Sequence, residues 1–417
     1  MLVLYFLLFY LCSSKELFED YYEEAEKYLN NMTLEDKVSQ MFIPKYVPAN
    51  ASEDLPNLKP GGYVLYAEHF NHEADYILDY VVKKNDISMK KIGLPLVLSV
   101  DEEGGAKHCR VSLKHRSEPF PTPQEIYNKS GIEGILKIDQ EKRDLLRRFF
   151  LNVNLAPVAD LSYNSSDYIF DRTIGRPANV SAEYIGADVE GYVKDNFTCC
   201  AKHFPGYGHN VDTHKGIGID NRSYETFLEE DFKTFEAAID KKVPMILVSH
   251  NIVKCKDPLY PASLSKTWID ILRNYLNFSG IVITDDISMQ GIQQYINNGT
   301  EAILAANAGN DLIITNNFRT HRQLVIEAVK NGTIKEETIN IAVRRVIAWK
   351  LQYLPRYYSK EEKKEDEPKS HTLAIVLGVI GGVIVIAIIV FVYLCFIRKP
   401  SNDSNENTNE DLLPKNN

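Results

Sequence analysis

Eight short apolar segments, separated by stretches of helix length, constrain the fold of this chain more than any other feature. Several have no polar alternation, and nearly continuous apolar strands are typical of parallel sheets that are buried on both faces. Eight strand-and-helix repeats over about 320 residues predict an α/β fold, a single closed (β/α)8 barrel of the TIM type. An open, doubly wound sheet is the alternative. The segments are residues 40–44, 62–66, 94–100, 153–158, 199–204, 245–250, 281–284 and 311–315.

Both ends of the chain predict a membrane topology. Residues 1–14 contain a short apolar run followed by small residues, which is typical of a cleaved signal peptide; a buried N-terminal segment is the alternative, because no positive charge precedes the run. Residues 372–397 are uncharged and exceed the roughly 20 residues that cross a bilayer, which predicts a transmembrane helix. The expected order is a signal peptide, a globular barrel domain over residues 15–355, a charged stalk over 356–371, the transmembrane helix, and a cytoplasmic tail over 398–417.

Sequences of the form Asn-X-Ser/Thr are frequent before the predicted transmembrane helix, whereas chance would give only about three or four. Such an excess indicates the secretory pathway. We therefore expect a single-pass type I membrane protein with its barrel outside the cell or in a lysosome-like or secretory lumen. Gly378 and Gly382 form a GxxxG pattern, which favours weak pairing of two copies of the membrane helix. The asparagines are Asn31, Asn50, Asn128, Asn164, Asn179, Asn196, Asn221, Asn277, Asn298 and Asn331.

Charge and cysteine content exclude some classes of function. The formal net charge of -10 provides no basic face for nucleic acid. No CxxC pair occurs, which disfavours a structural metal. Four cysteines lie in the predicted barrel domain, enough for one or two disulfides in an oxidising compartment. They are Cys109, Cys199, Cys200 and Cys255.

The segment richest in polar chemistry is residues 201–214. It begins on a predicted strand and continues into a Gly/Pro loop at the strand's carboxyl end, where barrels assemble active sites. Asp212 and His214 lie two residues apart on this loop, and a carboxylate beside an imidazole favours the cationic form, so the pair can act as a general acid and base. An Asp-X-His pair alone is more often solvated surface. Lys202 and His203 are either functional or satisfied polar groups of the core.

A second polar pattern follows the seventh apolar segment, where Asp285 and Asp286 end an apolar strand. Consecutive strand residues point to opposite sides, so we expect one acid to face the barrel mouth and the other to cap the next helix. Asp285 is the predicted nucleophile. The alternative is that both acids are only capping residues.

With these motifs, the chain resembles the single-domain bacterial β-N-acetylglucosaminidases of glycoside hydrolase family 3. The family pattern Lys-His-Phe-Pro-Gly-X-Gly, followed by Asp-X-His, is similar to residues 202–214, and Ser/Thr-Asp-Asp-hydrophobic-Ser-Met is similar to residues 284–289. The resemblance spans about residues 33 to 352. Further family-like stretches are residues 101–105, 154–160, 171–175 and 260–265.

The resemblance implies a retaining exo-β-N-acetylglucosaminidase. Such an enzyme removes terminal β-linked GlcNAc from glycans, such as muropeptides or chitooligosaccharides, through a covalent glycosyl-enzyme. It implies Asp285 as the nucleophile and His214 as the acid/base, oriented by Asp212, with no metal or other cofactor. Sugar contacts are implied for Lys202, His203, Arg172, Asp101, Arg110 and Met289.

The chain departs from the family pattern in two places. Tyr207 replaces a frequent His. The usual Gly-Gly-Arg-Val-X-Arg becomes residues 104–110, so Arg110 matches the second Arg only after a shift of one residue.

Other functions remain as alternatives. A β-glucosidase or β-xylosidase of the same family usually takes its acid/base from a second domain, for which the residues before the stalk leave no room. A catalytically silent membrane glycan receptor usually lacks the nucleophile or the acid/base, and candidates for both are present here. His209, Asp212 and His214 also have the chemistry of zinc ligands. A His acid/base leaves room for phosphate in place of water as the acceptor.

Overall fold

The computed structural model describes residues 15–213, 216–293 and 300–354, and a parallel sheet of eight strands lies at its centre. Each of the eight predicted apolar segments overlaps one of these strands. The strand order is β1-β10-β9-β7-β5-β4-β3-β2. Each strand therefore lies beside the strand of this sheet that comes before or after it in the sequence, and β1 also pairs with the last strand, β10. The strands are β1 (Phe42–Pro44), β2 (Gly62–Val64), β3 (Val97–Val100), β4 (Val153–Asn154), β5 (Thr198–Phe204), β7 (Met245–Val248), β9 (Ile281–Asp286) and β10 (Leu312–Thr315).

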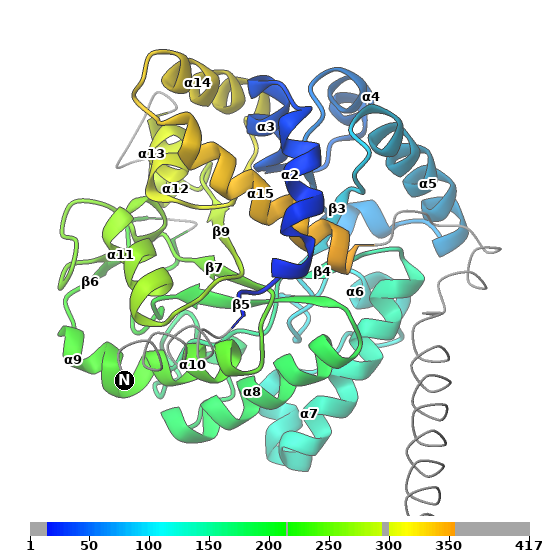
Figure 1. Ribbon diagram of the computed structural model, residues 1–417. Coiled ribbons are helices and arrows are strands. Elements are labelled where there is room, and N and C mark those ends of the chain that lie inside the picture. Colours follow the sequence, from blue (N-terminus) through cyan, green and yellow to red (C-terminus); the bar gives the residue numbers. More distant parts are fainter. Residues whose placement is uncertain (1–14, 214–215, 294–299, 355–417) are drawn as a thin grey trace, which may run out of the picture. The chain divides into compact units, whose positions relative to one another are not determined.

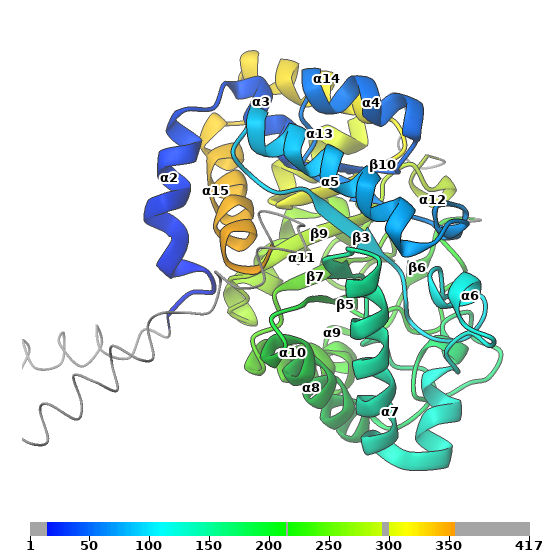
Figure 2. The ribbon, with the colours of Figure 1, turned by 90° about the vertical axis from the view of Figure 1, so that its right-hand side faces the viewer.

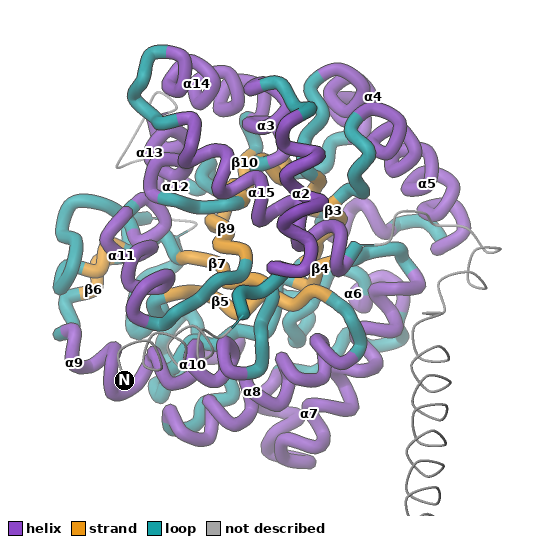
Figure 3. The backbone as a smooth tube through the Cα atoms, viewed as in Figure 1, coloured by secondary structure: helices purple, strands orange, loops and turns teal. Residues whose placement is uncertain are grey.

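Backbone hydrogen bonds also join the first strand to the second. The N–H of Gly61 donates to the carbonyl of Phe42 at 3.0 Å, and the N–H of Tyr46 donates to the carbonyl of Val64 at 2.9 Å. The sheet therefore closes into a barrel, as predicted, and the open-sheet alternative is excluded. Figure 3 shows the strands in orange, inside a ring of helices.

Helices connect the strands of the barrel and surround it (Figure 1). Two of the helices begin at caps that are visible in the sequence: Thr33 accepts a hydrogen bond from the N–H of Asp36, and Thr122 forms a capping box with Glu125. The surrounding helices are α3 (Leu34–Gln40), α4 (Pro48–Asn57), α5 (Ala74–Lys91), α6 (Ser112–His115), α7 (Pro123–Arg148), α8 (Ala178–Lys194), α9 (Tyr224–Thr226), α10 (Phe232–Asp240), α11 (Lys266–Asp270), α12 (Gln290–Gln293), α13 (Thr300–Ala308) and α14 (Phe318–Lys330). Shorter elements are the 3-10 or π turns η1 (Glu19–Tyr21), η2 (Ala67–Phe70), η3 (Phe170–Arg172), η4 (Phe227–Asp231), η5 (Ala262–Leu264) and η6 (Ile271–Tyr275), and a small sheet of β6 (Ile219–Asp220) and β8 (Ile252–Val253).

The amino ends of the strands are covered by α2 (Tyr22–Asn30) and α15 (Glu336–Tyr353), which lie on one side of the barrel in Figure 2. Trp349 donates its indole N–H to the hydroxyl of Thr198 at the start of β5. Lys350 is fully buried and donates to the carbonyl of Gly61 at 2.7 Å and to the side-chain oxygen of Gln40 at 2.9 Å. Burial lowers the pKa of Lys350 to about 7, because neither acceptor carries a charge.

The four cysteines of the barrel domain are free thiols. Cys199 and Cys200 are consecutive on β5, and they pack into two different hydrophobic clusters because successive strand residues point to opposite faces. The one or two disulfides that the sequence allowed do not form.

Within the described ranges, no helix is long and apolar enough to span a bilayer. The predicted signal peptide, stalk, transmembrane helix and tail all lie outside those ranges.

Candidate active site

A cavity of about 280 Å³ opens at the carboxyl ends of the strands. This is the end at which barrels of this type build their active sites. The volume lies just below the range for small-ligand sites, about 300–1,000 Å³, and suits a single sugar unit better than a long chain. Seven of the nine predicted site residues line the cavity: Asp101, Arg110, Arg172, Lys202, His203, Asp212 and Asp285.

Lys202, near the end of β5, is held between two carboxylates. Its Nζ lies 2.7 Å from Oδ1 of Asp101 and 2.6 Å from Oε1 of Glu103. Glu103 also accepts two hydrogen bonds from Arg172, each at 2.8 Å. We call these four side chains, Asp101, Glu103, Arg172 and Lys202, the charge-paired floor of the cavity. Their ion pairs fix the direction in which each charged group points, which suits hydrogen bonds to sugar hydroxyls.

The ionisation of this floor follows from its pairing. Burial acts to raise the pKa of Glu103, but the charges of Arg172 and Lys202 outweigh it and hold that pKa well below its usual range. Burial acts to lower the pKa of Lys202, and Asp101 and Glu103 raise it instead. Glu103, Lys202 and Arg172 therefore stay ionised across the physiological range of pH.

His203 is oriented from behind the cavity. Its Nδ1 lies 2.7 Å from Oδ2 of Asp160, and its Nε2 lies 3.3 Å from a guanidinium nitrogen of Arg172. A carboxylate accepts and a guanidinium donates, so these partners place the proton on Nδ1 and leave Nε2 as an acceptor. Lys202 and His203 both line the cavity although they are adjacent, and the pairing of β5 with β7 shifts its register between Lys202 and Phe204.

Asp285 and Asp286, at the end of β9, both line the cavity. The prediction that one acid faces the barrel mouth while the other caps the next helix is confirmed only in part. Asp286 does cap the following turn, because it accepts the N–H of Ser288 at 2.8 Å, yet it also borders the cavity. The ladder between β9 and β10 is irregular at this point, so simple alternation does not apply. Burial raises the pKa of Asp286.

The main chain beside the two acids is fixed by His250, which follows β7. Its Nε2 lies 3.0 Å from the carbonyl oxygen of Asp286 and its Nδ1 2.7 Å from the hydroxyl of Ser263. The ring therefore donates from Nε2 to the carbonyl and accepts the serine hydroxyl. Both residues belong to segments that the sequence singled out, but no pattern showed that they meet here.

The loop after β5 brings Asp212 to the cavity. Thr213 and Tyr207 line it as well, and the phenol of Tyr207 bonds to the loop backbone. His214, the predicted acid/base, lies outside the described residues.

Of the two remaining residues predicted to contact the sugar, Arg110 lines the cavity and Met289 does not. Arg110 lines the cavity beside Lys107 and His108, and its guanidinium donates to the carbonyl of Lys107 at 2.9 Å. Met289, in contrast, is buried and does not line the cavity. It lies in the turn after Asp286, where its backbone N–H donates to the carbonyl of Asp286, and not on the strand itself.

The sequence interpretation overlooked several residues of this site. Glu103 stood within a family-like stretch, but its importance depends on Arg172, which is distant in the chain. Asp160 ends another such stretch. Tyr66 and Tyr168 carried no signal, and burial raises the pKa of each phenol, so both stay neutral donors. Both acids, Glu103 and Asp160, follow a predicted strand closely, and a search for polar residues just after each strand would have found them.

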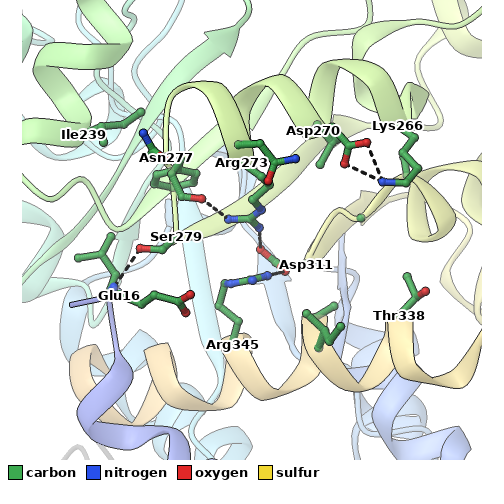
Figure 4. Close-up of a pocket in the computed structure, with 18 of the residues that line it drawn as sticks. Glu16, Ile239, Lys266, Asp270, Arg273, Asn277, Ser279, Asp311, Thr338 and Arg345 are labelled. Carbon is green, nitrogen blue, oxygen red and sulfur yellow. Dashed lines mark hydrogen bonds and ion pairs between the residues drawn. The ribbon is translucent and has the colours of Figure 1, made fainter. Parts of the chain in front are cut away.

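A larger cavity, about 660 Å³, lies near the amino ends of β9 and β10, where η6 faces α15 (Figure 4). The buried carboxylate of Asp311 pairs with Arg345 at 2.6 Å and with Arg273 at 2.5 Å, and at the exposed edge Lys266 pairs with Asp270. This internal pairing is structural and leaves little charge for a ligand. None of the predicted site residues lines this cavity.

Within the described ranges, no group of three or more His, Cys, Asp or Glu side chains is arranged to hold a metal. His209, one of the three candidate zinc ligands, is exposed and places its Nδ1 2.6 Å from a carboxylate oxygen of Asp167. Asp167 also accepts the hydroxyl of Ser162, so this contact connects the loop after β5 to the loop after β4.

A closed (β/α)8 barrel with carboxylates and paired cations at the carboxyl ends of its strands has the arrangement of a barrel enzyme's active site. Residues 33–349 match the glycosyl hydrolase family 3 N terminal domain, and the chain belongs to that family of glycoside hydrolases.

Individual relatives show the same similarity. A beta-hexosaminidase of Actinobacillus pleuropneumoniae serotype 5b is 29% identical over 321 residues, covering 72% of this chain and 88% of that protein. A beta-hexosaminidase of Glaesserella parasuis is 30% identical over 314 residues, with the same coverage of 72% and 88%.

Solved structures share the fold. A family 3 beta-N-acetylglucosaminidase from Paenibacillus sp. superimposes with a TM-score of 0.73 at 24% identity, over 77% of this chain and 63% of that chain. A family 3 glycosyl hydrolase from Mycobacterium smegmatis gives a TM-score of 0.69 at 25% identity, over 77% of this chain and 98% of that chain.

Proposed function

We propose that this chain is a retaining exo-β-N-acetylglucosaminidase that removes terminal β-linked GlcNAc from glycans. The observation that carries the proposal is the position of Asp285, at the carboxyl end of β9, in the same cavity as the paired floor of Lys202 and Arg172. The similarity to beta-hexosaminidases over most of their length supports it.

In this mechanism, Asp285 attacks the anomeric carbon and forms a glycosyl-enzyme, which water then hydrolyses with net retention. Most retaining glycosidases use a second carboxylate as the acid/base. Here His214 has that role, and Asp212, which lines the cavity, orients the imidazole and favours its charged form. Asp101, Lys202, His203, Arg172 and Arg110 hold the sugar hydroxyls.

The activity is tested with the purified full-length chain in mild detergent. Nitrophenyl β-N-acetylglucosaminide is compared with nitrophenyl β-glucoside and β-xyloside, and then with muropeptides and chitooligosaccharides. We expect cleavage of the N-acetylglucosaminide, with preference over the glucoside by at least about tenfold, the discrimination that a site gains by bonding a polar substituent. No turnover on any of these substrates would favour a silent glycan receptor.

The proposed location is a membrane, as a single-pass type I protein whose barrel lies outside the cell or in a lysosome-like or secretory lumen. Every sequon asparagine within the described ranges is solvent-exposed, as N-glycosylation requires of the folded product; Asn298 lies outside them. Removal of N-glycans by an endoglycosidase should increase gel mobility, and protease added to intact cells or vesicles tests the orientation. Unchanged mobility would contradict the proposal.

A further inference from the structure

Tyr207 follows β5 and is buried, with only 2% of its surface exposed. Its hydroxyl donates to the carbonyl of Val211 at 2.9 Å and accepts the backbone N–H of Thr213 at 2.9 Å. The hydroxyl of Thr213 lies 3.1 Å away and can donate to the same oxygen. One phenol oxygen therefore bonds the main chain on both sides of Asp212.

The other contacts of Tyr207 lead to the sugar-facing side of the cavity. Its backbone N–H donates to Asp160 at 2.8 Å, and the same carboxylate holds Nδ1 of His203. The phenol ring packs edge-on to His203, with ring centroids 5.5 Å apart, and against Tyr168 at 5.7 Å. Tyr207 thus connects the group that orients His203 to the loop that carries Asp212.

The loop needs such an anchor because its backbone is permissive. Gly206 and Gly208 flank Tyr207, with φ of 132° and 57°, conformations that favour glycine. A loop that begins with two glycines has many accessible conformations, and a buried side-chain bond that spans Asp212 removes most of them.

We propose that Tyr207 is a positioning residue for the loop after β5, whose hydroxyl fixes the backbone at Val211 and Thr213 and so holds the Asp212 carboxylate at the cavity. The inference rests on the proposed function. Burial raises the pKa of Tyr207, so the anchor stays neutral where a histidine would titrate.

The test compares wild type with Tyr207→Phe, which removes only the hydroxyl. The matched control is Tyr63→Phe, because Tyr63 is also buried but its hydroxyl has no hydrogen-bond partner within the described part of the chain. Turnover is measured on dinitrophenyl and on phenyl β-N-acetylglucosaminide, whose leaving groups differ in their need for protonation. Unfolding temperatures of all three proteins are recorded.

Tyr207→Phe should lower kcat/KM, which reports formation of the glycosyl-enzyme, about tenfold on the phenyl glycoside and less than about twofold on the dinitrophenyl glycoside. Only departure of the phenyl group depends strongly on a well-placed acid. Tyr63→Phe should change neither rate. If Tyr207→Phe folds poorly, Thr213→Val, which removes one of the three contacts, should shift the ratio of the two rates in the same direction by about threefold.

Equal losses on both substrates, or no loss, would overturn the positioning role while leaving the proposed function intact. A wild-type chain that cleaves neither substrate would instead remove the proposed function, and the inference with it.

Discussion

Glu103 and Arg172 form a two-point ion pair inside the barrel mouth, with Nε 2.8 Å from Oε2 and Nη2 2.8 Å from Oε1. Both side chains are almost fully buried. The pair joins the loop after β3 to the loop after β4, and it sets the position of Lys202, which shares Glu103 with Arg172.

Arg172→Met should therefore reduce both stability and substrate binding. Removal of Arg172 leaves the buried charge of Glu103 with only partial compensation, from Lys202 at 2.6 Å and His108 at 4.0 Å. Such losses cost about 3–5 kcal/mol in the free energy of unfolding. Denaturant unfolding measures that cost, and KM should rise in parallel. Arg176→Met is the control, because Arg176 bonds only to an exposed Asn128 side chain and to the carbonyl of Gly175. Similar effects for the two variants would contradict the importance of the pair.

The buried Lys350 should make the free energy of unfolding depend on pH, independently of the residues of the active-site cavity. Its folded pKa of about 7 lies below its ordinary value of 10.5, so the unfolded state binds more protons between these two pH values. Stability of the wild type, relative to Lys350→Met, should consequently rise as pH increases from about 7 towards 10 and be flat below about 6.

The measurement is the free energy of unfolding of both proteins at pH 6 and pH 9, with Lys330→Met as an exposed control. Lys330 pairs with Glu35 at the surface and should give a difference of at most about 1 kcal/mol at either pH. A difference between wild type and Lys350→Met that falls with pH would show that Lys350 is not buried as a depressed-pKa amine.

Much of the fold was predictable from the sequence, because strands that are buried on both faces appear in it as runs of apolar residues. All eight segments overlap a strand, but two of the strands are shorter than predicted where a proline interrupts the ladder. The segment 94–100 pairs only from Val97, after Pro95, and the segment 153–158 pairs regularly only at Val153–Asn154, before Pro157.

The site was predictable as a set of motifs but not as a network. Strand ends indicated Asp285, Lys202 and His203, because parallel strands bring their carboxyl ends together. The partnership of Glu103 with Arg172, and the presence of both Asp285 and Asp286 in one cavity, depend on long-range packing and on local shifts in register, which no periodicity in the sequence encodes.

His214→Ala should separate substrates by their leaving groups. Loss of a general acid costs about 10²- to 10⁴-fold where departure needs a proton and much less where the phenol is activated. The measurement is kcat/KM on phenyl and dinitrophenyl β-N-acetylglucosaminides, which reports formation of the glycosyl-enzyme alone. His209→Ala, on the same loop but exposed and paired with Asp167, should change both rates only slightly. Equal damage across the two substrates by His214→Ala would rule out the acid/base role.

Chelation should leave the enzyme active. None of the steps assigned to Asp285, Asp212 or His214 requires a metal ion, so dialysis against EDTA should not lower kcat. Activity that is lost in EDTA and restored by added zinc would favour the reading of His209, Asp212 and His214 as ligands.

The central claim is that Asp285 becomes covalently attached to the sugar. A fluorinated β-GlcNAc donor with an activated leaving group slows hydrolysis of the glycosyl-enzyme enough for mass spectrometry of its peptides. We predict a stoichiometric sugar adduct on Asp285, no adduct in Asp285→Ala, and a β-configured first product. An adduct on another residue, or a first product of α configuration, would contradict the account.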